Sequence, residues 1–427
     1  MQVSILKIFF CMLMLCSFLI SSAQETLKTA DDYFKKQDYE KALQHLQIML
    51  NNPQQLKGDE HCFALLLKAK SQLNLLDRAV KNKDNKNIEK YKDAYFLAYQ
   101  DLIEARKFML GEAAKKEAES LGNYLHRSIT NLGAGILNTI YSDAKMTQSA
   151  KDASLDEAQK YLMAAISLKP NDYSAYDFYG QVMMLKKADD DALAYFEKSK
   201  KYFAESKTNS TDLGHFRVYG NIAIIQLNRK NGAEALKTIE TAKNNLESHY
   251  QRINKKDSLS NKEYLGMKSL LQNIENDIYL NSPDLAQKAI EKFNNQIKAN
   301  PSELSARFSL AQVYEQQKMY SEAAAEYESL FKIDSTNRLA NYNLGILYLN
   351  EAIGIESKIN PEDADTKLKT KFTNLLQRSE NSLKKALGPE EKDIECIDAL
   401  LKTYTRLQNK EAYLYYRNLK TALLKSK

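Results

Sequence analysis

Small residues recur at a fixed distance along this chain. Ala158 and Ala192 lie 34 residues apart, and Ala289 and Ala323 are separated by the same distance. A period of this length is typical of a supersecondary unit that repeats, because such a unit needs its neighbours to bury its apolar face. The spacing therefore favours a stacked array of similar units over a single globular core.

The segment Leu304–Ser335 shows what one unit contains. Two stretches with apolar residues at helical spacing flank a short polar turn. The two stripes consist of Leu310, Ala311 and Tyr314, followed by Ala323, Tyr327 and Leu330. Because Ala311 and Ala323 are small, the two helices can approach closely, with the larger side chains filling the space beside them. We therefore predict two amphipathic helices packed face to face.

Helix-breaking residues are scarce, and they lie where helices should end. The 427 residues include 13 glycines and 6 prolines, and no long stretch alternates apolar and polar residues as a half-buried strand would. Most prolines either follow a periodic helical stretch or open one, namely Pro53, Pro170, Pro301, Pro389 and, after Ser282, Pro283. The predicted fold class is all-α.

The paired helices resemble the tetratricopeptide repeat, a family of 34-residue helix–turn–helix units. The unit that matches position by position contains Tyr176, Tyr179, Gly180, Met183, Ala192, Phe196 and Ser199. Tyrosine stands where the family has tryptophan, in keeping with a chain that lacks tryptophan. The resemblance implies a right-handed α-solenoid of stacked antiparallel helix pairs, a superhelix of about eight repeats with a concave inner face.

The repeat pattern also suggests how the chain is divided. We expect residues 24–150 to hold an N-terminal repeat and a degenerate region with an elongated helix near 117–141, and residues 151–427 to hold a more regular array. Polar inserts near 205–213, 251–262 and 354–371 account for spacings longer than 34. Ser154 and Glu157 form a capping-box pattern, which predicts that a helix begins there.

Residues 1–23 have the layout of a secretory signal peptide. Lys7 precedes the mostly apolar run Ile8–Ile20, and Ser21–Ala23 supplies the small residues of a cleavage site. The run is short for a membrane span, which needs about 20 residues, and Leu15 before Cys16 argues against lipoprotein cleavage. The junction also resembles those of exported proteins of the Bacteroidota. We expect an exported protein, in the periplasm or at the cell surface of a Gram-negative bacterium, with no membrane span after cleavage.

Charge and cysteine content exclude further classes. The net charge is +6, and lysines alternate with carboxylates instead of forming a one-sided basic stripe, so nucleic-acid binding is not expected. Beyond the leader the cysteines are Cys62 and Cys396. Residues so far apart in a solenoid lie beyond disulfide distance. We predict that both are buried core residues.

Motifs for catalysis or metal binding are absent from the sequence. It contains no HExxH, GxSxG, CxxC or P-loop pattern. The histidines are scattered, with no two at i, i+3 or i, i+4; they are His45, His61, His126, His215 and His249. No metal site and no cofactor is therefore expected. The glycines of Leu132–Ile136 follow no predicted strand, which favours close helix packing over a phosphate loop.

The resemblance also implies where a partner would bind, because in this family the first helix of each pair lines the inner groove. The matching positions are Asp177, Gln181, Met184, Ile224, Leu227, Phe308, Gln312, Glu315, Tyr342, Ile346 and Leu349. The later ones are apolar or aromatic, which favours a helix or an extended peptide as partner. The alternative is that curvature or the inserts bury these side chains. The basic clamp by which some members hold chaperone C-termini is not present.

The function expected from these features is a non-catalytic scaffold that binds a protein or peptide partner in the cell envelope. Two alternatives stay open. Tyrosine rings gathered on one outer face would favour a carbohydrate- or cell-wall-binding protein. A deep pocket with clustered ionisable groups near 251–262 or 354–371 would favour an enzyme with a site between the inserts.

Overall fold

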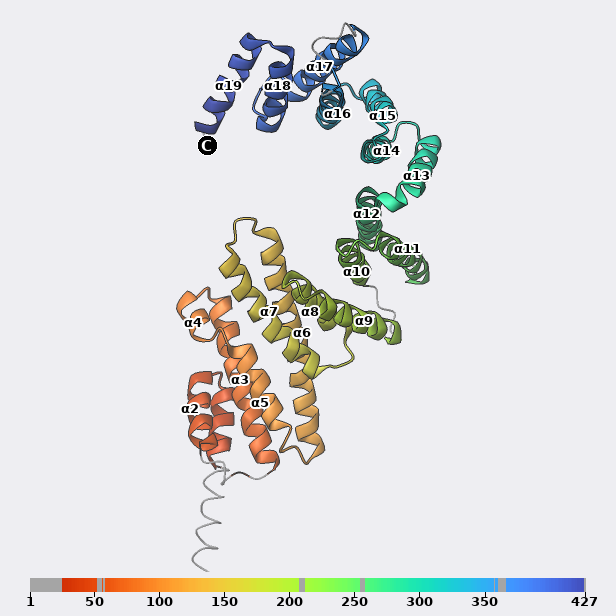
Figure 1. Cartoon of the computed structure of the whole chain (residues 1–427). Helices are drawn as coiled ribbons and strands as arrows, with labels where there is room; N and C mark the ends of the chain where they lie inside the picture. Colours follow the sequence, from red (N-terminus) through yellow and green to blue (C-terminus); the bar gives the residue numbers. More distant parts are fainter. Residues whose placement is uncertain are drawn as a thin grey trace, which may run out of the picture. The chain divides into compact units, whose positions relative to one another are not determined.

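The structure, a computed structural model, describes residues 25–51, 56, 58–206, 212–253, 258–356, 358–359 and 366–425. Within these residues the chain forms helices and turns, with no strand. Residues 25–35 are helical. The helices that follow are α2 (Tyr39–Leu50), α3 (Asp59–Lys81), α4 (Asn85–Lys90), α5 (Ala94–Ala105), α6 (Glu112–Ser142), α7 (Gln148–Leu168), α8 (Tyr173–Leu185), α9 (Asp189–Glu205), α10 (Arg217–Asn228), α11 (Gly232–Ile253), α12 (Ser258–Asn281), α13 (Ala286–Ala299), α14 (Leu304–Gln316), α15 (Tyr320–Ile333), α16 (Arg338–Glu356), α17 (Thr366–Leu387), α18 (Ile394–Leu407) and α19 (Lys410–Lys425), with 3-10 turns at Gly214–Phe216 and Pro283–Leu285 (Figure 1). The predicted all-α helical repeat fold is confirmed, whereas the handedness of the superhelix stays a prediction.

One type of tight turn joins several of the helix pairs. Between α14 and α15, the backbone of Lys318 has a φ of 60°, in the left-handed region that residues with a Cβ seldom adopt. The Met319 amide donates to the Tyr314 carbonyl at 2.8 Å, and the Lys318 amide donates to the Glu315 carbonyl at 2.9 Å. This is a Schellman motif. The same left-handed position recurs at Gln37, Lys83, Lys187, Lys230 and Gln408.

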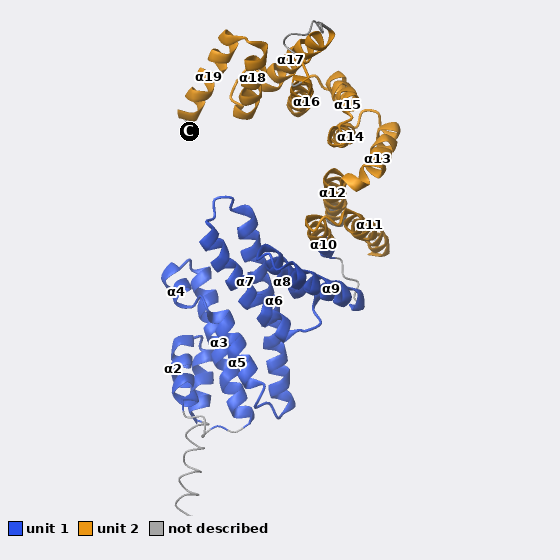
Figure 2. Ribbon diagram, in the orientation of Figure 1, with its two compact units in different colours: residues 1–218 blue, residues 219–427 orange. Residues whose placement is uncertain are grey.

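The chain divides into two compact units, residues 1–218 and residues 219–427 (Figure 2). The sequence-based division at residue 150 separates irregular from regular repeat spacing. The division at residue 218 instead separates two groups of helices that pack mainly among themselves. Helices α7, α8 and α9 therefore belong to unit 1, although their repeat pattern resembles that of unit 2.

The core of unit 1 is formed by α3, α5, α6 and α7. Leu66, Leu102 and Leu125 are fully buried there. The elongated helix predicted near 117–141 is α6, which has 31 residues and begins at Glu112. Its buried residues run from Ala114 to Ile140, so the helix packs along nearly its whole length.

Unit 2 contains smaller cores that follow one another along the chain. In the segment Leu304–Ser335, Ala311 and Ala323 are fully buried in one cluster with Tyr327, as predicted. This cluster extends to α16 and α17. A further cluster joins α17, α18 and α19 around Leu400.

Helices extend into two of the segments predicted as polar inserts. α11 continues to Ile253 and α12 begins at Ser258, so helix covers much of 251–262. α16 continues to Glu356 and α17 begins at Thr366, so helix also enters 354–371 from both sides. The inserted residues thus partly lengthen the helices, because lysine is a good helix former and polar composition alone does not indicate a loop.

The helix predicted to begin at Ser154 begins six residues earlier, at Gln148. The Thr147 hydroxyl accepts a hydrogen bond from the Ala150 amide at 3.3 Å and caps the helix. Ser154 lies inside α7. The capping-box interpretation was wrong because Leu155 is buried, and its packing keeps this turn within the helix.

The predicted signal peptide, residues 1–23, lies outside the described residues and stays a prediction. None of the helices in the described ranges is long and apolar enough to cross a bilayer. Cys62 and Cys396 are buried and not in a disulfide, as predicted. Burial raises the pKa of each thiol to about 11, so neither is a reactive thiolate at neutral pH.

Candidate functional site

The predicted groove residues of unit 1 lie on α8, and two of the three are in the interior. Asp177 and Gln181 are buried, and the Gln181 amide donates to the Asp177 carboxylate at 3.0 Å. Burial raises the pKa of Asp177 to about 7, against the opposing effects of Gln181 and Arg217. Met184 is half-buried. At the first two positions the structure shows an internal polar pair, and a partner-binding role for their side chains is not favoured.

The residues predicted on α14 are half-buried. The Phe308 ring packs edge-on against the Tyr327 ring, with centroids 5.8 Å apart. The Tyr327 hydroxyl donates to Glu315 at 3.4 Å, and burial raises the pKa of Glu315. Gln312 lies between them along the helix. Phe308 therefore contributes to the core as well as to the surface.

The residues predicted on α10 and α16 differ in exposure. Ile224 is 36% exposed, and Leu227 is half-buried. Tyr342 and Ile346 are half-buried and pack against the cluster that joins α17, α18 and α19. Leu349 is only 2% exposed. Because Leu349 packs within the core shared with α17, the surface available on α16 is narrower there than the resemblance implied.

Two residues of α16 that were not predicted complete an apolar surface. Leu339 is 51% exposed and Ile353 is 37% exposed. Successive residues of an α-helix are turned by about 100°, so Leu339, Tyr342, Ile346 and Ile353 project within about 60° of one another. We call these four residues the α16 stripe. Their spacing of three, seven and fourteen residues was visible in the sequence.

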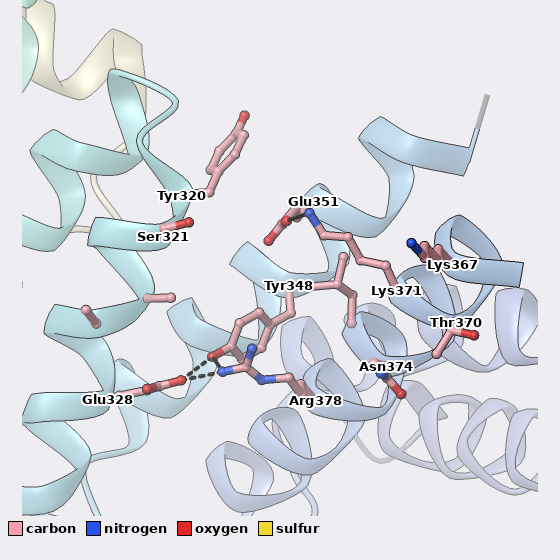
Figure 3. A pocket seen from close by; sticks show the side chains of 13 residues that line it. Tyr320, Ser321, Glu328, Tyr348, Glu351, Lys367, Thr370, Lys371, Asn374 and Arg378 are labelled. Carbon is pink, nitrogen blue, oxygen red and sulfur yellow. Dashed lines mark hydrogen bonds and ion pairs between the residues drawn. The ribbon is translucent and has the colours of Figure 1, made fainter. Parts of the chain in front are cut away.

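A pocket of about 740 Å³ lies among α15, α16 and α17. Tyr320, Ser321, Ala324, Ala325 and Glu328 line it from α15, Tyr348 and Glu351 from α16, and Lys367, Thr370, Lys371, Asn374, Leu375 and Arg378 from α17 (Figure 3). Tyr348 and Glu351 are turned by about 120° to 180° from the α16 stripe. The pocket therefore lies on the other side of α16.

One corner of the pocket is closed by a compact polar network. The Tyr348 hydroxyl donates to the Glu328 carboxylate at 2.7 Å. The Arg378 guanidinium donates to Glu328 and to the Tyr348 hydroxyl, and it lies 4.1 Å from the centre of the Tyr348 ring (Figure 3). Burial, followed by the hydrogen bond to Glu328, raises the pKa of Tyr348. These three side chains hold α15, α16 and α17 in register.

The opposite part of the pocket is more open. The Lys371 ammonium lies 2.8 Å from a Glu351 carboxylate oxygen, with 55% of the Lys371 side chain exposed. Lys367, Thr370 and Asn374 follow on the same side of α17 and are also exposed. This half of the pocket is lined by exposed polar side chains.

The pocket lies beside the segment 354–371, where the enzyme hypothesis placed its site. Its two carboxylates, Glu328 and Glu351, are both paired with cations. No histidine or cysteine lines it. Among the described residues no group of histidine, cysteine, aspartate or glutamate side chains is arranged to hold a metal ion. The arrangement is suited to binding, and it contains no recognisable nucleophile–base pair.

Within each unit, the described tyrosines do not gather on one outer face. Those that are exposed are Tyr124 and Tyr141 on α6 and Tyr415 on α19. Tyr124 and Tyr141 are 17 residues apart on α6 of unit 1, and Tyr415 is the exposed tyrosine described in unit 2, so neither unit by itself shows a row of exposed tyrosine rings. This observation does not favour the carbohydrate-binding alternative in the form in which the sequence suggested it.

Comparisons with known proteins give a family match over part of the chain. No curated protein matches this chain. Among solved structures, a tetratricopeptide repeat protein from Parabacteroides merdae is similar at 15% identity, over 78% of this chain and 99% of that chain, with a TM-score of 0.31. PilF of Pseudomonas aeruginosa is similar at 16% identity, over 60% of this chain and 92% of that chain, with a TM-score of 0.32. YrrB, described as a TPR protein with an unusual peptide-binding site, is similar at 14% identity, over 55% of this chain and 80% of that chain, with a TM-score of 0.22. Residues 283–338, which include α13, α14 and α15, match the family model "Tetratricopeptide repeat". The segment 283–338 is therefore similar to the tetratricopeptide repeat.

Proposed function

We propose that this protein is a non-catalytic scaffold that binds a protein or peptide partner in the cell envelope, and that the α16 stripe is its main contact. The observation that carries this proposal is the row Leu339, Tyr342, Ile346 and Ile353, which is apolar yet half-buried or exposed. Tetratricopeptide repeats provide a rigid framework typical of protein–protein interaction, in which little ordering entropy is lost on binding.

The dimensions of the stripe suit a helical or extended peptide. Leu339 and Ile353 are fourteen residues apart, which corresponds to about 21 Å along the helix axis. An amphipathic helix from a partner could place three or four apolar side chains over this length. Tyr342 and Ile346, which are supported from behind by α18, would be the rigid anchors in the middle.

Substitution of the exposed ends of the stripe tests the proposal. Leu339 and Ile353 are already in contact with solvent, so the double variant Leu339→Glu, Ile353→Glu should fold like the wild type. We expect it to lose partners that the wild type enriches from an envelope extract, measured by quantitative mass spectrometry. The matched control is Leu265→Glu on α12, where the leucine is 53% exposed outside the stripe. Equal enrichment by the wild type and the double variant would disprove the role of the stripe.

The location in the cell envelope is a separate part of the proposal. It is supported by Lys7, the apolar run Ile8–Ile20 and the small residues Ser21–Ala23. Expression of the full chain in a Gram-negative host should yield a mature protein that begins at Gln24 and fractionates outside the cytoplasm. N-terminal sequencing of the purified protein checks this. An intact leader on a cytoplasmic protein would contradict it.

A further inference from the structure

Helix α18 repeats the framework of α16 and has charged residues where α16 has its apolar stripe. Leu344 and Tyr348 of α16 are matched fifty-six residues later by Leu400 and Tyr404 of α18, and all four are buried. The same spacing takes the first three residues of the stripe to a row on α18, which consists of Glu395, Asp398 and Lys402. These three residues project within about 60° of one another. Because α16 and α18 are in contact, the charged row is the neighbour of the stripe (Figure 1).

Two of the three charges on this row are available to a partner. The Asp398 carboxylate is already occupied, because the Lys420 ammonium lies 2.5 Å from it. Glu395 and Lys402 are exposed, and neither side chain has an ion pair or a hydrogen bond among the described residues. They are seven residues apart, which corresponds to about 10 Å along the helix axis. The row therefore presents one open negative charge and one open positive charge at a fixed spacing.

The open carboxylate lies close to the aromatic anchor of the stripe. The Tyr342 ring packs against the cluster that contains Cys396, the residue after Glu395. Burial raises the pKa of Tyr342, and the negative charge of Glu395 raises it further. Arg338 opposes this effect, and its guanidinium is itself paired with Asp393. A cation bound at Glu395 would therefore lie beside the Tyr342 ring, an arrangement that suits lysine or arginine.

The other flank of the stripe has a different character. On α14, the positions thirty-four residues before the first three stripe residues are uncharged, namely Ser305, Phe308 and Gln312. The acidic residue that follows on this side, Glu315, is half-buried and accepts a hydrogen bond from the Tyr327 hydroxyl at 3.4 Å. Selection of a partner by charge is therefore expected on the α18 side of the stripe.

We propose that the partner segment is an amphipathic helix with a basic and an acidic residue seven positions apart at one edge of its apolar row. The basic residue pairs with Glu395 and the acidic residue with Lys402, while the apolar row covers the α16 stripe. Because the two charges of α18 have opposite signs, they also fix the direction in which the helix binds. This inference rests on the proposed function, to which it adds the composition of the partner.

Synthetic helices of about eighteen residues, long enough to cover the stripe, are the probes. The charged helix carries lysine and glutamate seven positions apart beside a row of leucines, and both orders of the two charges are made. The neutral helix has glutamine at both positions. Isothermal titration of the purified protein measures each affinity. We expect one order to bind about three- to ten-fold more tightly than the neutral helix, as two exposed ion pairs allow, and the other order to bind no better than the neutral helix.

Charge exchange places the recognition on α18. In the variant Glu395→Lys, Lys402→Glu, the peptide with the opposite order of charges should become the tighter ligand. The matched control is Glu411→Lys, Lys425→Glu, which exchanges two exposed charges of α19 and should keep the wild-type preference. The variant Leu339→Glu, Ile353→Glu should lose the binding of every helix.

The outcomes separate this inference from the proposed function. If all helices bound the wild type equally, the stripe would stand and the charge pattern would be rejected. If no helix bound, both proposals would fall. A charged helix interrupted by a central proline should bind weakly, and equal binding of this version would show that the partner is extended. A preference that survives the charge exchange on α18 would also overturn the inference.

Discussion

The α6–α7 pair of unit 1 and the α16–α17 pair of unit 2 are both longer than a standard repeat, but they use the added length differently. The α6 helix has 31 residues and α17 has 22. Both pairs meet at a glycine. A Cβ added to Gly133 would lie 2.6 Å from the Leu162 side chain, and one added to Gly345 would lie 2.6 Å from the Leu383 side chain.

The two pairs differ in what lies beyond this contact. In α6 the residues on the packed side are apolar from Ala114 to Ile140, so added length adds buried surface. At the ends of α16 and α17 the facing residues include Glu351, Lys367 and Lys371, and the added length encloses a polar pocket. Extension of a repeat thus produces stability where the sequence is apolar, and a potential binding site where it is charged.

The largest expected difference between the units is in how their stability depends on pH. Unit 1 has the buried carboxyl of Asp177 at the repeat position where unit 2 has Phe308. The folded pKa of Asp177, about 7, lies above its ordinary value of 3.8, so the native state holds a proton that the unfolded chain has released. Its contribution to stability is therefore complete below about pH 4 and is lost as pH rises through 7. The difference amounts to roughly 4 kcal/mol at most.

Asp177→Asn should remove this dependence and make the protein more stable than the wild type at pH 8. The asparagine keeps an acceptor for Gln181 and cannot ionise. Urea unfolding followed by circular dichroism at pH 4 and pH 8 measures the effect. Asp191→Asn, which alters an exposed carboxylate of α9, is the matched control. Parallel pH profiles for the wild type and Asp177→Asn would contradict the assignment.

Glycine-to-alanine substitutions at the two close contacts should each destabilise the protein by about 1–3 kcal/mol through overpacking. Gly345→Ala should lower the free energy of unfolding more than Gly133→Ala. A Cβ at residue 345 would also lie 3.2 Å from the Leu383 backbone nitrogen, which cannot move aside. Hydrogen exchange in α16 and α6 would report each change locally. Equal tolerance of both variants would show that the pairs can separate freely.

Two other glycines in these helices, Gly135 and Gly354, should stabilise the protein when they are replaced by alanine. Around a Cβ at Gly135 or Gly354 there is no atom within 4 Å. Alanine at these positions should raise helix stability by up to about 1 kcal/mol, and by less at Gly354, which lies in the last turn of α16. Thermal melting of Gly135→Ala against Gly133→Ala therefore compares two helix positions that differ only in packing.

The smallest expected effects concern the shared turns. Lys187 and Lys318 hold positive φ angles, one in each unit. The left-handed conformation costs a residue with a Cβ about 1–2 kcal/mol, whereas glycine loses about 0.5–1 kcal/mol in chain entropy. Lys187→Gly and Lys318→Gly should thus each stabilise their unit by roughly 0.5 kcal/mol in urea unfolding. A loss of stability would show that the lysine side chain supports the turn.

The repeat fold could be predicted from sequence because its signals are local and periodic. Ala311, Ala323 and Tyr327 are spaced as two facing stripes require, and they are buried together. The interpretation of Leu132–Ile136 as a close helix contact agrees with the packing of Gly133 against Leu162. Such contacts follow from the size and spacing of residues within one or two repeats.

Helix bounds and the candidate sites were harder to predict because they depend on packing between helices. Ser154 carries a helix-start pattern, but the burial of Leu155 overrides it. The burial of Asp177 could not be inferred from its family position, since the corresponding Phe308 and Tyr342 are half-buried. The pocket combines three helices, and its only sequence signal is the row of polar residues from Lys367 to Arg378.

The stripe and the pocket share one helix, α16. Its stripe faces one way while Tyr348 and Glu351 face another, so any rotation of the helix about its axis displaces both at once. Thermodynamic linkage then requires reciprocity: a molecule in the pocket that turns α16 changes the affinity of the partner by the same factor by which the partner changes the affinity of that molecule.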